Sequence, residues 1–247
     1  MRYLETIQTD FQTVEVWKSG EEVEFRVAGA VHAWFHRDHL LSGLAWDLIA
    51  AGSLLGVEAP RSVLMLGLAG GTSLRILRQL LPNARFVAVE IDAGIVAAAR
   101  KHMHLDSLEI EIHIDDGYRW LESQRERFDV VIDDAYLAGE DDVFRPRLPD
   151  ERWLRYFEQV LSPEGVMVVN LVTGLGHRKI QSRVRHALLG QYPEVGSLTA
   201  PDALNEALVA GPRVHSKSRI KQYAEKFSHP IDRAYWQQIA LRRLRAR

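Results

Sequence analysis

Apolar runs alternate with helical segments from about residue 62 onward, and this alternation constrains the fold more than any other feature. The runs 63–66, 86–89 and 130–132 contain no polar residue, as is typical of strands covered on both faces of a parallel sheet. Further strands are predicted at 110–114, 166–171, 196–199 and 207–209, and helices at about 73–81, 93–102, 118–123 and 151–161. This order predicts βαβ units with right-handed crossovers. The expected fold is α/β, with a Rossmann-like doubly wound, mostly parallel sheet.

The first 36 residues have a different pattern. Apolar and polar residues alternate over 14–16 and 23–27, with a turn at Ser19–Gly20 between them. Such alternation is typical of antiparallel strands with one exposed face. A third strand is predicted at 31–35, and Asp38 is predicted to cap a helix that runs to Ala51. We therefore divide the chain into an N-terminal β-hairpin region, 1–36, and an α/β domain, 37–247.

Composition excludes several classes of site. The 247 residues include no cysteine, which excludes disulfides, thiolate nucleophiles and cysteine metal sites. The net charge of −2 favours neither nucleic acid nor a membrane surface as a partner. The longest apolar stretch, 40–57, is interrupted by Trp46 and Asp47 and predicts a buried helix rather than a membrane span. Because the first residues lack a signal-peptide pattern, a cytoplasmic protein without a membrane segment is expected.

The chain becomes basic after Gly211, where ten lysines and arginines face only Glu225 and Asp232. One interpretation is a tail that binds RNA or another polyanion. The other is an amphipathic final helix whose arginines are solvated, docking through Tyr235, Trp236, Ile239, Leu241 and Leu244. The second is favoured, so the domain is expected to end in a basic helical segment and nucleic acid is not an expected partner.

A glycine-rich turn follows the first buried strand. In a doubly wound sheet, ligands bind at the carboxyl ends of the strands, where the strand order reverses. Glycines there let a ligand approach bare backbone, although a loop can also need glycine for its turn alone. The spacing matches neither the dinucleotide fingerprint nor the P-loop. The candidate binding residues of this turn are Gly67, Leu68, Ala69, Gly70 and Gly71.

Acidic residues end the next two strands. Glu90 comes about twenty residues after the glycines, where a carboxylate can accept hydrogen bonds from both hydroxyls of a ribose. Asp115 and Asp116 end the third strand, where a carboxylate can accept a hydrogen bond from the exocyclic amine of adenine. Each acid could instead cap a helix, as Asp92 is well placed to do. The succession favours an adenosine-containing ligand, bound by Glu90, Ile91, Asp115, Asp116 and Gly117.

Four motifs, 65–71, 89–92, 114–117 and 128–134, together with the segments 11–16 and 36–39, resemble the successive motifs of the spermidine synthase family. They are similar, more loosely, to those of class I methyltransferases. The resemblance implies a methyltransferase-type domain that binds S-adenosylmethionine or decarboxylated S-adenosylmethionine. It places Glu90 at the ribose, Asp116 at the adenine amine and the 67–71 loop at the methionine-like part. It also implies a homodimer.

Several positions depart from that family's pattern. The family's aspartate within the glycine loop is Gly70 here, and the second of its two aspartates after the fourth strand is Leu137. Residues 42–44 and Ala33 also stand where the family has polar side chains. A polyamine carries several cationic groups, and each needs an opposing carboxylate when it is buried. These losses argue against spermidine as the product.

Asp134 matches the acid that faces the amine acceptor in the family. It is the candidate catalytic group, which would steer or deprotonate an amine, unless it only caps the loop. Tyr136 is a candidate wall of the acceptor pocket, and His36 and His39 are candidates near the acceptor, one of them as a base. The spacing of these histidines and His32 defines no metal site, and none is expected.

The loop 133–150 is rich in acids, among them residues 140–142. These acids fit either a solvated loop or a lid that attracts a cationic acceptor.

Three functions stay open. The main hypothesis is methyl transfer from S-adenosylmethionine to a small molecule, for which an amine is one candidate. The second is aminopropyl transfer from decarboxylated S-adenosylmethionine, as in polyamine synthases. The third is a non-catalytic nucleoside-binding or regulatory protein, in which the loss of acceptor acids would follow from the loss of the reaction.

Overall fold

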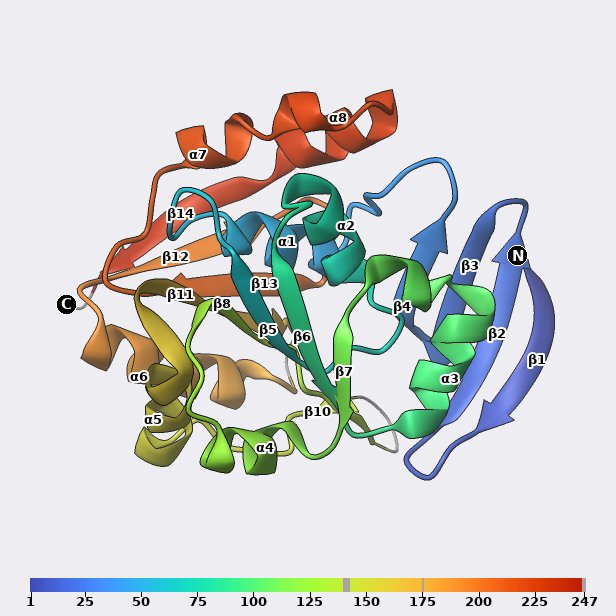
Figure 1. Cartoon of the computed structure of the whole chain (residues 1–247), viewed down its shortest axis with the longest axis horizontal. Coiled ribbons are helices and arrows are strands. Elements are labelled where there is room, and N and C mark those ends of the chain that lie inside the picture. Colours follow the sequence, from blue (N-terminus) through green and yellow to red (C-terminus); the bar gives the residue numbers. More distant parts are fainter. Residues whose placement is uncertain (140–142, 175, 246–247) are drawn as a thin grey trace.

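An eight-stranded sheet forms the centre of the computed structural model, which describes residues 1–139, 143–174 and 176–245 (Figure 1). Its strand order is β14-β12-β13-β11-β8-β5-β6-β7. Strands β11, β8, β5, β6 and β7 are parallel, and β13, β12 and β14 extend one edge in antiparallel fashion. In this spatial order the strands are Ala240–Arg245, Glu194–Thr199, Asn205–Ala210, Leu161–Val172, Phe128–Asp133, Ser62–Leu66, Arg85–Glu90 and Glu111–Ile114. The predicted doubly wound, mostly parallel sheet is confirmed.

Helices cover both faces of the sheet because successive residues of each buried strand point to opposite faces. Val63 and Met65 of β5 pack in one apolar cluster with α1, α2 and α3, whereas Leu64 and Leu66 pack in a second with α4, α5 and α6. Residues 63–66 are therefore apolar without exception. The helices are α1 (Ala45–Ser53), α2 (Thr72–Leu80), α3 (Ala93–His102), α4 (Gly117–Ser123), α5 (Glu151–Val160), α6 (Arg178–Gln191), α7 (Lys217–Lys221) and α8 (Pro230–Gln238).

The strand order reverses between β5 and β8. The chain runs from β5 to β6 and β7 on one side, then returns to β8 and β11 on the other. The loops that follow β5 and β8 therefore diverge, and a crevice opens at the carboxyl ends of these strands. The predicted ligand loop and the predicted acids all lie at this edge of the sheet.

The N-terminal strands form a separate four-stranded antiparallel sheet (Figure 1). Buried side chains of this sheet belong to the same apolar cluster as α1, α2 and α3. The turn between its first two strands is also held by α3, because Thr9 Oγ1 and Gln12 Nε2 donate to the Asp92 carboxylate at 2.7 and 3.0 Å. The predicted N-terminal antiparallel extension is confirmed, and it comprises β1 (Arg2–Gln8), β2 (Thr13–Ser19), β3 (Glu22–Val27) and β4 (Ala30–His36).

The first helix begins later than predicted. The Asp38 side chain does not cap it, and α1 begins at Ala45. The preceding turn contains Gly43 with φ +78°, a conformation that favours glycine. The buried Asp47 carboxylate accepts the Gly43 N–H at 2.7 Å, so an acid inside the first helical turn fixes the turn before it. The prediction of a helix from Asp38 was wrong because this turn occupies the intervening residues.

The basic end of the chain also differs from the predicted helical segment. Helix α8 ends at Gln238, and residues 240–245 form the edge strand β14. Arg243 and Arg245 donate to Glu194 on the neighbouring strand, and opposite charges paired across strands stabilise a sheet. Trp236 is buried, as expected for a docking residue. Among the described residues, no helix is long and apolar enough to cross a membrane.

Candidate active site

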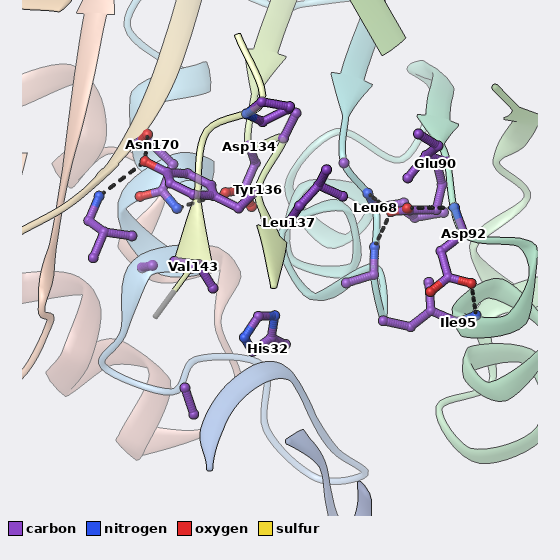
Figure 2. A pocket seen from close by; sticks show the side chains of 18 of the residues that line it. His32, Leu68, Glu90, Asp92, Ile95, Asp134, Tyr136, Leu137, Val143 and Asn170 are labelled. Atoms are coloured by element: carbon purple, nitrogen blue, oxygen red, sulfur yellow. Dashed lines mark hydrogen bonds between the residues drawn. The ribbon is translucent and has the colours of Figure 1, made fainter. Parts of the chain in front are cut away.

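A cavity of about 550 Å³ opens at the carboxyl ends of β5, β6, β7 and β8. We distinguish two sides: in Figure 2, Leu68, Glu90 and Asp92 of one side lie at the right, Tyr136, Val143 and Asn170 of the other lie at the left, and His32 of the N-terminal sheet lies below. The glycine-loop side consists of Gly67, Leu68, Ala69, Glu90, Ile91, Asp92, Asp116 and Gly117. The Asp134 side consists of Asp134, Tyr136, Leu137, Val143, Asn170 and Asn205.

Glu90 holds the glycine loop. It ends β6 and is 8% exposed. Its Oε2 accepts the backbone N–H groups of Leu68 and Ala69 at 2.7 and 3.0 Å, and its Oε1 accepts that of Asp92 at 3.0 Å. The carboxylate thus fixes the loop against the end of β6 and places negative charge on the cavity wall. Its contact with a ribose stays a prediction.

Gly67 brings the glycine loop against the chain at Asp134. It has φ +81°, and a Cβ atom at this position would lie 2.5 Å from the backbone oxygen of Asp134. The Asp134 N–H in turn donates to the carbonyl of Leu66 at 2.9 Å. Only a residue without a side chain permits this approach. The loops after β5 and β8 are therefore in direct contact.

Gly70 and Gly71 do not line the cavity. A Cβ atom on Gly70 would lie 2.5 Å from both the Ala33 Cβ and the Met103 Sδ, so this glycine permits packing beneath the N-terminal sheet. Gly71 is the residue before α2, with φ +74°. Of the five predicted loop residues, Gly67, Leu68 and Ala69 reach the cavity.

The structure separates the two acids that follow β7. Asp116 lines the cavity together with Gly117. Its Oδ1 caps α4 by accepting the N–H groups of Tyr118 and Arg119 at 2.9 and 3.2 Å, and these bonds do not use Oδ2. Asp115 lies outside the lining and pairs with the Arg119 guanidinium, whose hydrogen bond lowers the pKa of Asp115. Of the two acids only Asp116 lines the cavity, and its contact with an adenine amine stays a prediction.

Asp134 lies where the two sides meet. Its Oδ1 accepts the Asn170 side-chain amide at 2.7 Å. Burial raises the pKa of Asp134 to about 7, and the charges of Asp133 and Glu90 also raise it, whereas the Asn170 bond and the Arg145 charge lower it. A carboxyl group with a pKa near neutrality can exchange a proton at neutral pH.

A buried ion pair anchors the chain that closes the Asp134 side. The side chains of Asp133 and Arg145 are 0% and 1% exposed, and their charged groups are 2.7 Å apart. Trp153 Nε1 also donates to Asp133 at 3.0 Å, and Arg145 Nη2 donates to the carbonyl of Asn170 at 2.9 Å. Such a pair is stable only when its hydrogen bonds are satisfied. It ties residues 143–146 to β8 and β11. The predicted lid acids 140–142 lie outside the described residues.

Tyr136 lines the cavity, but the structure does not bring His36 or His39 there. The His39 ring packs against those of His36 and His229, with centroids 4.1 and 5.3 Å apart, and burial lowers the pKa of His39. His32 lines the cavity instead. It lies four residues before His36 on β4, a separation of roughly 13 Å in a strand.

The cavity wall is acidic. Within the described part of the chain, no lysine or arginine lines it, and no cluster of three or more side chains could hold a metal ion. Such a wall favours a cationic ligand over an anionic one. Five lining residues carry carboxylates, namely Glu90, Asp92, Asp116, Asp134 and Asp202.

Many lining residues were not predicted from the sequence, among them Gln12, Trp46, Asn170 and Asn205. One signal was available, because Asn170 is a polar residue in the otherwise apolar run 166–171. It is 6% exposed, and a buried side-chain amide needs partners. Asn205 carries no such signal, since its place depends on the antiparallel pairing of β13 with β11.

Comparisons with known proteins agree with this geometry. Residues 47–200 match the family model "Spermine/spermidine synthase domain". A probable polyamine aminopropyl transferase of Bifidobacterium longum is 29% identical over 195 residues, which are 77% of this chain and 42% of that protein. An eEF1A lysine and N-terminal methyltransferase of Bos taurus is 28% identical over 197 residues, 75% of this chain and 27% of that protein. This chain spans less than half the length of either relative.

The fold is similar to that of solved spermidine synthases. One such structure, in complex with the transition state analogue AdoDATO, matches with a TM-score of 0.74 and 18% identity, over 98% of this chain and 86% of that one. The family model covers more than half of this chain, including the glycine loop, Glu90, Asp116 and Asp134. The chain therefore belongs to the family of proteins with a spermine/spermidine synthase domain.

Proposed function

We propose that this protein transfers an aminopropyl group from decarboxylated S-adenosylmethionine to an amine acceptor. This reverses the order of the hypotheses drawn from the sequence, in which methyl transfer came first. Family membership supports a transferase of this class, and the similarity to the Bifidobacterium aminopropyl transferase supports the aminopropyl reaction.

The charge of the cavity wall carries the proposal. S-Adenosylmethionine has a carboxylate, whereas its decarboxylated form has only a cationic sulfonium and a cationic amine. Five carboxylates and no lysine or arginine line the described cavity. Burying an unpaired carboxylate beside other acids is unfavourable, so this wall fits the decarboxylated donor. An amine acceptor is also cationic before it reacts.

The wall offers groups for the remaining parts of such a donor. Glu90 would accept hydrogen bonds from the ribose hydroxyls and Asp116 one from the adenine amine, while Leu68 and Ala69 contact Glu90 and Gly67 contacts the Asp134 backbone. The bound donor would supply a carbon made electrophilic by the adjacent positive sulfur. The protein must then align that carbon with the acceptor nitrogen.

Asp134 is proposed to take the proton of the reaction. The acceptor nitrogen forms a bond to the aminopropyl carbon, the carbon–sulfur bond breaks, and its electron pair stays on sulfur as a neutral thioether, methylthioadenosine. The new secondary ammonium group, or the attacking amine before it, must release a proton. Because the pKa of Asp134 is raised to about 7, its ionised form can accept this proton near neutral pH.

The test is a product analysis with matched donors. The purified protein is incubated with decarboxylated S-adenosylmethionine and, separately, with S-adenosylmethionine, each with a panel of monoamines, diamines and spermidine. Mass spectrometry should detect methylthioadenosine and an aminopropylated amine in the reactions that contain the decarboxylated donor, and neither product in those that contain S-adenosylmethionine. Production of S-adenosylhomocysteine and a methylated acceptor, with no use of the decarboxylated donor, would overturn the proposal.

Methyl transfer is the second candidate, favoured by one observation in the loop. Position 70 has no acid, and a side chain there would clash with Ala33 and Met103. Gly70 itself lies outside the cavity lining, so the loop adds no carboxylate of its own to the cavity, which is compatible with the carboxylate of S-adenosylmethionine. The similarity to the bovine methyltransferase agrees with it. Binding of either nucleoside without turnover would instead support the non-catalytic hypothesis.

A further inference from the structure

Asn170 connects Asp134 to Asn205 across neighbouring segments of the sheet edge. Asn170 Nδ2 donates to Asp134 Oδ1 at 2.7 Å, and Asn205 Nδ2 donates to Asn170 Oδ1 at 3.1 Å. In the β11–β13 ladder Asn170 pairs with Ala207. Asn205 lies two residues from Ala207 on the same strand, which makes it the diagonal neighbour of Asn170 on the same face. All three polar side chains line the cavity.

The order of these two bonds fixes the orientation of the Asn170 amide. An ionised carboxylate only accepts hydrogen bonds, so the NH₂ group of Asn170 must point to Asp134. The amide oxygen then points to Asn205, which donates to it. The Asn170 backbone is also held, since its carbonyl accepts hydrogen bonds from Tyr136 Oη at 3.0 Å and from Arg145 Nη2 at 2.9 Å. Little freedom of rotation remains for the side chain.

We infer that Asn170, oriented by Asn205, is a positioning residue that engages Oδ1 of Asp134 and so reserves Oδ2 for the acceptor amine. This inference rests on the proposed function, in which Asp134 is the base. It assigns to a buried polar residue of β11 a role that its place in an apolar strand otherwise leaves unexplained. Asn205 acts one step further away, through Asn170.

The same bond affects the pH at which Asp134 is ionised. The charged and titratable groups that act on it are Asp133 at the end of β8, Glu90 at the end of β6, and Arg145 from the loop after β10. Tyr136 lies close enough to interact with it electrostatically. A hydrogen bond from Asn170 stabilises the charged carboxylate, so its removal raises the pKa of Asp134. For a bond to a charged group the rise is on the order of one pH unit.

The experiment compares wild type with Asn170→Leu, Asn205→Leu and Ser197→Ala. The last variant removes a buried hydrogen bond between β12 and β13, from Ser197 to Glu206, whose two residues do not line the cavity. The acidic limb of the kcat/KM profile should move to higher pH by about one unit in Asn170→Leu and by less in Asn205→Leu. In Asn170→Leu kcat should fall about tenfold, while the Kd of the donor, measured by calorimetry, stays within twofold.

A second readout does not need turnover. In protein with ¹³C-labelled aspartate carboxyl groups, NMR titration should give Asp134 a midpoint near pH 7 in wild type and a higher one in Asn170→Leu. If wild type transfers no group but the midpoint moves, the proposed function fails and the positioning of Asp134 stands. If wild type is active but neither the profile nor the midpoint moves, the inference fails and the proposed function stands. An equal shift in Ser197→Ala would also overturn it.

Discussion

The glycine-loop side and the Asp134 side of the cavity are built by different means. On the glycine-loop side, each residue follows its own strand of the parallel sheet directly, and Glu90 ties two such ends together through backbone N–H groups. On the Asp134 side, Asn170 and Asn205 come from strands that meet only through antiparallel pairing. Arg145 comes from a loop and is held by a buried ion pair.

Under the proposed function, the difference separates the residues that bind the donor from those that take part in the reaction. Residues that end or directly follow the parallel strands make up the glycine-loop side, which suits a part of the ligand that stays the same throughout the proposed reaction. Side-chain hydrogen bonds between strands and a buried ion pair fix the Asp134 side, and there the pKa of Asp134 depends on burial and on several surrounding groups. We therefore expect substitutions on the glycine-loop side to change the donor Kd, and those on the Asp134 side to change kcat.

The sharpest test of this division is Asp134→Asn. An amide cannot accept the proton, so kcat should fall by about 10²–10⁴, while the Kd of the donor changes less than threefold. Stopped assays of product and calorimetry of donor binding measure the two quantities. A donor Kd that rises in proportion to the loss of kcat would contradict the assignment of donor binding to the glycine-loop side.

Arg145→Met tests how much the buried ion pair with Asp133 stabilises the Asp134 side. The change leaves Asp133 buried without its ion partner, which should lower the free energy of unfolding by about 3–5 kcal/mol. Urea denaturation followed by circular dichroism measures this effect. The exposed pair of Arg100 and Asp106 provides the control, since Arg100→Met should change stability by less than about 1 kcal/mol. Equal effects of the two changes would contradict the structural role of the buried pair.

Glu90→Gln probes the other side. The neutral amide keeps the shape of the side chain but loses the charge and one acceptor for the three backbone N–H groups that Glu90 now binds. Hydrogen bonds to a charged group are worth about 1.5–3 kcal/mol, so the Kd of the donor should rise about 10–100-fold. The kcat at saturating donor should stay within a few-fold. An unchanged Kd would remove Glu90 from the proposed nucleoside site.

The two sides also differ in how far the sequence predicts them. Apolar runs that end in glycine or acid were enough to predict the sheet, the position of Glu90 and the cap at Asp92, because these depend on residues close in the chain. The same reasoning assigned Gly70 to the ligand, although the position is closed by Ala33 and Met103. The residues around Gly70 do not indicate that the N-terminal sheet packs against this loop.

On the Asp134 side, the acid itself was predicted but its surroundings were not. Asn170 and Asn205 become neighbours through the ladder between β11 and β13, which no local pattern specifies. His36 and His39 were predicted to lie near the acceptor, but β4 ends at His36, and it is His32, four residues earlier on that strand, that lines the cavity. The strand β14 was missed for a related reason, since Glu194 on another strand fixes it.

Asp116→Ala has the smallest expected effect. It tests whether the glycine-loop side binds the adenine of the donor as well as its ribose. Loss of one hydrogen bond to an adenine amine should weaken donor binding about tenfold, and loss of the α4 cap should lower the free energy of unfolding by about 1 kcal/mol. Asp115→Ala is the matched control, because its carboxylate lies outside the cavity and pairs with Arg119. A preference of wild type for adenosine over inosine nucleosides that is lost in Asp116→Ala but kept in Asp115→Ala would tie the effect to the exocyclic amine. If both variants bound the donor as wild type does, Asp116 would be a helix cap and nothing more.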